Sequence, residues 1–150
     1  MTLQNLLRIG KLKEHTPTAA EVLRLLEAVD RNLADAAVDV ISLETRFDTA
    51  YKAVMQCALA AMLASGYRPS TGEPGHHQTM IQSMPLTLGV SNDTWVVLDA
   101  LRRKRNANDY LGAMVTLDMV SECLAQGKAL RSRLRAHLAA HHPDLLKKPK

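Results

Sequence analysis

The side chains best suited to chemistry lie in one stretch, residues 101–110, with the sequence LRRKRNANDY. It opens with four consecutive cations, Arg102, Arg103, Lys104 and Arg105. In a helix, residues four apart share a face, so Arg105 is expected beside Asp109 and Asn106 beside Tyr110. A cation, a carboxylate, an amide and a phenol on adjoining faces can bind an anion or take part in acid–base chemistry.

Two interpretations of this stretch remain open from the residues alone. Arg105 follows Leu98 and Leu101 at helical spacing, which places it on the stripe that should face the core or a partner. It can form an ion pair with Asp109, or it can bind an anion or nucleotide. The three cations before it are either a solvated helix face or phosphate contacts that carry affinity without sequence choice.

Apolar residues recur at three- and four-residue spacing along most of the chain, which predicts helices. Their expected ranges are about 2–13, 17–38, 43–65, 76–84, 92–111 and 117–142. Thr16 followed by Pro17, or Thr18 with Glu21, can cap the second helix. The helix from Leu43 is apolar on nearly every side and is therefore expected at the centre of the fold.

The composition agrees with an all-α protein. Of the 150 residues, 47% are hydrophobic but only 3% are aromatic, so the core must be built from Leu, Ala, Val and Met. Such a composition is rich in good helix formers and poor in strand formers. We find no linker or repeat and predict a single domain over 1–150, in which 143–150 form a basic tail. Gly127, inside the last helix, suggests close packing or a bend.

Charge and cysteine content limit the possible functions. The net charge is +4, and residues 128–150 contribute +6 of it (seven Lys and Arg against Asp144), so the remainder carries −2. Cys57 and Cys123 fall inside apolar helical runs and are expected to be core residues in a reducing compartment. The sequence shows neither a signal peptide nor an apolar run of about 18 residues, so we expect a cytoplasmic protein without membrane contact.

The histidines do not form a convincing metal site. His137 and His141 are one turn apart and His142 adjoins them, but no carboxylate or cysteine stands at a matching spacing. His76 and His77 more simply begin a helix. We therefore predict no metal and no cofactor.

The order of these motifs along the chain resembles that in HEPN domains (higher eukaryotes and prokaryotes nucleotide-binding). The resemblance covers roughly residues 20–140: Ala50-Tyr51 with an Ala-rich run on the central helix, then Gly66-Tyr67, a loop with His77, and Arg-x-x-x-Asp-Tyr over 105–110. It implies an up-down bundle of four or five helices with a short N-terminal helix, of bacterial or archaeal origin. It also implies a homodimer whose two motifs face each other.

Many HEPN proteins are metal-independent RNases, and others are noncatalytic partners of nucleotidyltransferases in toxin–antitoxin pairs. Arg105 and Asn106 match the start of the RNase motif, but Asp109 and Tyr110 stand where its histidine is expected. An aspartate paired with arginine is a weak base, and a tyrosine hydroxyl is not ionised near neutral pH.

The resulting hypothesis is a noncatalytic HEPN-type dimer that binds RNA, DNA or a nucleotide-handling protein such as a cognate nucleotidyltransferase or antitoxin. Its expected binding residues are Arg102, Arg103, Lys104, Arg105, Asn106, Tyr51 and His77. The alternative is an RNase toxin with an altered motif, in which Arg105, Asp109 and Tyr110 would be catalytic. A dimerising scaffold without a ligand is a third possibility.

Overall fold

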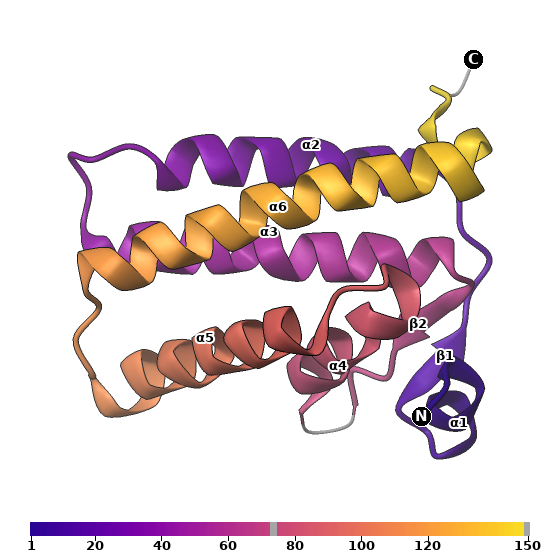
Figure 1. Cartoon of the computed structure of the whole chain (residues 1–150), viewed down its shortest axis with the longest axis horizontal. Coiled ribbons are helices and arrows are strands. Elements are labelled where there is room, and N and C mark those ends of the chain that lie inside the picture. Colours follow the sequence, from indigo (N-terminus) through magenta and orange to yellow (C-terminus); the bar gives the residue numbers. More distant parts are fainter. Residues whose placement is uncertain (73–74, 149–150) are drawn as a thin grey trace.

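The structure is a computed structural model that describes residues 1–72 and 75–148, and it confirms an all-α bundle with a short N-terminal helix (Figure 1). The described helices are α1 (Leu3–Arg8), α2 (Ala19–Ala36), α3 (Leu43–Ala64), α4 (His76–Thr87), α5 (Asn92–Leu111), α6 (Leu117–His141) and the 3-10 helix η1 (Pro143–Leu146). Two short strands, β1 (Leu12–Glu14) and β2 (Tyr67–Pro69), pair antiparallel. Among the described residues, no helix is both long and apolar enough to cross a membrane.

Helix α3 is the centre of the fold, as its sequence predicts. It contacts α2, α4, α5 and α6, and thirteen of its residues are buried. Phe47 is fully buried, and small residues such as Ala58, Ala60 and Ala61 allow the neighbouring helices to approach closely. Ser42 caps the helix by accepting a hydrogen bond from the Thr45 backbone N–H.

Gly127 is a close-packing position. A Cβ atom at this residue of α6 would lie 2.7 Å from the Leu33 Cδ2 atom of α2 and 3.8 Å from Val54 Cγ2 of α3. The absence of a side chain therefore lets three helices meet, which explains a glycine in the middle of a long helix.

Replacing Gly127 with valine is expected to lower the free energy of unfolding by about 1–3 kcal/mol, because the added side chain would overpack this contact. Chemical denaturation measures the change. Ala125→Val, at an exposed position of the same helix, is the matched control and should cost much less. Equal losses in the two variants would contradict the close-packing role of Gly127.

The N-terminal region differs from the prediction of one helix over 2–13. Helix α1 ends at Arg8, Gly10 has a positive φ of 81°, and the chain then forms β1, where Leu12 is buried. Leu12 reaches the core through the extended strand rather than a helix face, because β1 pairs with β2 in a segment predicted to be a loop. A three-residue strand is too short to show an alternating pattern in sequence.

One boundary was left open by the sequence, and two others differ from the prediction. Of the two candidate caps of α2, Thr18 is confirmed, since it accepts a hydrogen bond from Glu21 N–H. Helix α4 continues past Pro85 to Thr87, since a proline near the end of a helix removes only one late hydrogen bond. Residues 143–146 of the predicted tail form η1, whose Leu145 and Leu146 pack against the core; residues 149–150 lie outside the described part.

Candidate functional site

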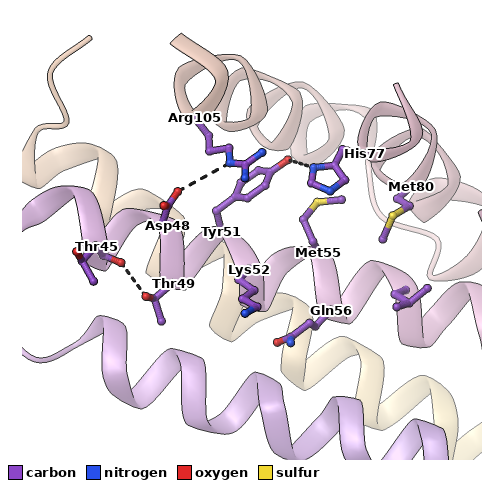
Figure 2. Close-up of a pocket in the computed structure, with 11 residues that line it drawn as sticks. Thr45, Asp48, Thr49, Tyr51, Lys52, Met55, Gln56, His77, Met80 and Arg105 are labelled. Atoms are coloured by element: carbon purple, nitrogen blue, oxygen red, sulfur yellow. Dashed lines mark hydrogen bonds and ion pairs between the residues drawn. The ribbon is translucent and has the colours of Figure 1, made fainter. Parts of the chain in front are cut away.

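An open groove runs along α3, with a volume of about 580 Å³. Side chains of α3 form its floor, and His77 and Met80 of α4 and Arg105 of α5 stand along one side (Figure 2). The residues that α3 contributes are Thr45, Asp48, Thr49, Tyr51, Lys52, Met55, Gln56 and Leu59. The groove combines two cations, one carboxylate, an amide, an imidazole and thioether and aliphatic surface.

Arg105 is held in the groove by contacts from two helices. Its guanidinium carbon lies 5.4 Å from the centre of the Tyr51 ring, a cation–π distance. Its Nε atom is 3.0 Å from Asp109 Oδ2 and 3.8 Å from Asp48 Oδ1. This Nε is buried and makes no hydrogen bond of acceptable angle within the described chain, so the Asp109 contact is an ion pair without an aligned hydrogen bond. Both carboxylates make their closest approach to the inner nitrogen of the guanidinium.

Tyr51 links Arg105 to His77. The Tyr51 side chain is buried, and its hydroxyl lies 3.4 Å from His77 Nδ1, a long hydrogen bond. Burial raises the pKa of Tyr51 to about 12, although Arg105 and Arg102 act in the opposite direction, so the hydroxyl keeps its proton. This buried O–H group has a hydrogen-bond acceptor only if it donates to His77 Nδ1. Neutral His77 then carries its own proton on Nε2 and is a hydrogen-bond donor there.

The pKa of His77 lies below its usual value of about 6.5, first because of burial and then because His76, Arg105 and Arg102 repel a further positive charge. Between the lowered pKa and 6.5 the unfolded chain binds more protons than the folded chain. The free energy of unfolding therefore falls as the pH drops through this window, because the proton at His77 binds more tightly to the unfolded chain.

We expect the ring resonances of His77 in an NMR titration to show a midpoint below pH 6.5. Arg105→Gln should shift this midpoint upward, because it removes one repelling charge. A wild-type midpoint above 6.5 would contradict the described environment of His77.

The other cations of the motif do not line the groove. Arg102 Nε lies 2.9 Å from Asp99 Oδ1, and Arg103 Nη2 lies 2.8 Å from Asp99 Oδ2. Asp99 is buried, yet its pKa lies below the usual range: burial raises it, and the hydrogen bonds from Arg103 and Arg102 outweigh this effect. Arg102 and Arg103 thus satisfy a buried carboxylate, a role that sequence reasoning missed although the i+3 and i+4 spacing indicates it.

The remaining motif residues lie near the end of α5. Lys104 is exposed, Asn106 is half-buried, and Tyr110 is 80% exposed beyond the groove. The structure therefore brings together Tyr51, His77 and Arg105, with Asp109 as the partner of Arg105. It does not bring Arg102, Arg103, Lys104, Asn106 or Tyr110 into the groove lining.

Sequence reasoning also missed the polar residues of α3. Asp48, Lys52 and Gln56 repeat every four residues, and Thr45 and Thr49 extend the same strip. A polar strip on an otherwise apolar central helix indicates one uncovered face, and this signal was available in the sequence.

Neither the cysteines nor the histidines form a second reactive centre. Cys57 and Cys123 are buried free thiols, and burial raises the pKa of each to about 12. The rings of His137 and His141 lie 4.7 Å apart, centre to centre. Across residues 1–72 and 75–148, no group of three or more His, Cys, Asp or Glu side chains is arranged to hold a metal ion.

Comparison of the chain with protein-family models, with curated proteins and with solved structures finds no match in any of the three. The fold and the groove thus define an all-α bundle with one open, polar face on its central helix.

Proposed function

We propose that the groove binds single-stranded nucleic acid without cleaving it, with a phosphate at Arg105. The observation that carries the proposal is the position of Arg105: Tyr51, Asp109 and Asp48 fix the guanidinium at the edge of a groove that also contains Lys52. Because both carboxylates approach Nε most closely, the two terminal nitrogens suit bidentate contact with a phosphate.

The rest of the groove suits a nucleotide unit. The Nε2–H group of His77 adds a neutral donor on the same side as Arg105, and Lys52 adds a cation from α3. Leu59 and the accessible edges of the buried Met55 and Met80 provide apolar surface for a base. The Oε1 atom of Gln56 accepts a hydrogen bond from Asn32 Nδ2, so Gln56 offers its amide N–H groups to the edge of the base. Unstacked bases of a single strand are available for such contacts, whereas those of a duplex are not.

The arrangement favours binding over catalysis. A general base for RNA cleavage needs a free lone pair, but the available lone pair of neutral His77, on Nδ1, faces the Tyr51 hydroxyl. Asp109 forms an ion pair with Arg105 and is not among the residues that line the groove. The resemblance of residues 105–110 to HEPN domains supports the same proposal and extends it to a cytoplasmic homodimer, including one within a bacterial toxin–antitoxin pair.

A ribonuclease remains the second candidate, because His77 lies in the groove with Arg105 even though no histidine follows in the motif itself. If the Tyr51 hydroxyl relayed a proton, His77 could replace the missing histidine as the base.

The proposal is tested with a fluorescently labelled 12-nucleotide single-stranded RNA and its DNA equivalent, in EDTA, at 50 and 200 mM salt. One or two phosphate contacts predict roughly threefold to sevenfold weaker binding at the higher salt, with the strand intact. Absence of binding at 50 mM, or affinity that does not change with salt, would overturn the proposal. RNA cleavage in EDTA that is lost in His77→Gln would establish the ribonuclease instead.

A further inference from the structure

A second surface, separate from the groove lining, is formed by exposed apolar residues. Among the described residues, seven of the eleven exposed large apolar side chains belong to two connections between helices and the helix ends beside them. The α2–α3 connection contributes Val38, Val40 and Ile41, and the α5–α6 connection contributes Tyr110, Leu111, Met114 and Leu117. Leu111 and Met114 are 83% and 84% exposed, so neither side chain packs against its own chain to a significant extent.

Both connections lie at the same end of the bundle, opposite the two termini (Figure 1). Contacts between the helices agree with this placement. Asp48, early in α3, approaches Arg105, late in α5, and Gly127 of α6 packs beside Leu33, late in α2. We call this surface, formed by the seven apolar side chains and the carboxylates around them, the acidic end.

Negative charge predominates at this end, where the nearest cations are Arg105 and Arg46, whose Nε donates a hydrogen bond to Ala36 O. Residues 35–45 and 106–127 contain no Lys, Arg or His. They contain six carboxylates, all on exposed residues: Asp35, Asp39, Glu44, Asp109, Asp118 and Glu122. Asp109 pairs with Arg105, and no ion pair within the described chain involves the other five. The acidic end therefore presents apolar side chains among carboxylates that outnumber the cations beside them.

The negative charge determines which kind of molecule can bind at the acidic end. A nucleic acid or an anionic membrane would be repelled. A two-fold contact of this end with itself in a second copy would place carboxylates opposite carboxylates, which is unfavourable. A protein segment that carries both Lys or Arg and apolar residues matches both features of the surface.

We propose that the acidic end docks a partner protein through a short segment that is both basic and apolar. The proposal does not depend on nucleic-acid binding at the groove, because the exposed apolar residues are not part of the groove lining. The apolar side chains supply the buried contact, and the carboxylates steer the encounter and exclude acidic segments.

The test is selection of 12-residue peptides from a random display library against the whole protein at low salt. The double variant Leu111→Ser, Met114→Ser serves for counter-selection. Both positions are highly exposed, so the variant should fold normally, and its unfolding curve checks this. We expect the selected peptides to be enriched in Lys or Arg together with Leu, Ile, Phe or Trp. A chosen peptide should bind the double variant at least tenfold more weakly than wild type.

The control variant Ile9→Ser, Val96→Ser removes two exposed apolar side chains elsewhere and should leave the affinity unchanged. Three results would overturn the proposal: no enriched peptides, peptides without basic residues, or equal losses in the two double variants. A homodimer in sedimentation that Leu111→Ser, Met114→Ser dissociates would also overturn it, since the occupant would then be a second copy.

Discussion

Replacing Arg105 with glutamine is expected to weaken binding of single-stranded RNA by about tenfold to a hundredfold, the range for loss of one or two charged hydrogen bonds. Among the cations of residues 1–72 and 75–148 the effect should be largest here, because Arg105 is the one fixed by both an aromatic ring and carboxylates at the groove. Fluorescence anisotropy at 50 mM salt measures it. The salt slope should also fall by about 0.7, the contribution of one single-strand phosphate contact.

The matched control for this prediction is Arg133→Gln, which removes the same charge from an exposed position on α6, outside the groove lining. Its effect on affinity should be less than about threefold, because a cation outside the binding site contributes only through the screened long-range field. Equal effects of the two substitutions would mean that the nucleic acid binds to net charge and not to the groove.

Replacing Phe47 with alanine should lower the free energy of unfolding by about 3–5 kcal/mol, as expected for a large aromatic removed from a close-packed core. Phe47 is the chain's one phenylalanine and is fully buried in α3, the helix that contacts most of the others. A loss of this size is a large part of the stability of a small domain, so part of the variant should be unfolded near 37 °C.

Urea or guanidinium unfolding of Phe47→Ala measures the loss, with Val40→Ala as the control. Val40 is 86% exposed, so its truncation should change stability by less than about 0.5 kcal/mol. A cost below about 1 kcal/mol for Phe47→Ala would contradict the central position of α3.

The sequence predicts the long helices well, because the signals that define them lie within the helices themselves. These signals are the apolar spacing, the N-caps Ser42, Ser91 and Thr116, and Gly112 at a helix end. The errors lie where tertiary contacts decide. Strands β1 and β2 exist because they pair with each other across more than fifty residues, and η1 is ordered because its leucines pack against the core.

The candidate site was predicted in part. Arg105 with Asp109 follows from helical spacing, and it is confirmed as a contact. The partnership of Arg105 with Tyr51 and His77 joins three helices, so spacing within one helix cannot show it. The ion pairs of Arg102 and Arg103 with Asp99 lie within one helix. They could have been predicted from spacing if burial of the Asp99 carboxylate had been expected.

The most direct test of nucleic-acid binding at the groove is to map it. Titration of the isotope-labelled protein with the 12-nucleotide RNA, followed by amide chemical shifts, distinguishes the groove from the basic C-terminal region. If the RNA binds in the groove, we expect the largest shifts between Thr45 and Leu59 of α3, at His77 and around Arg105. Shifts confined to residues 128–148, with none along α3, would contradict it.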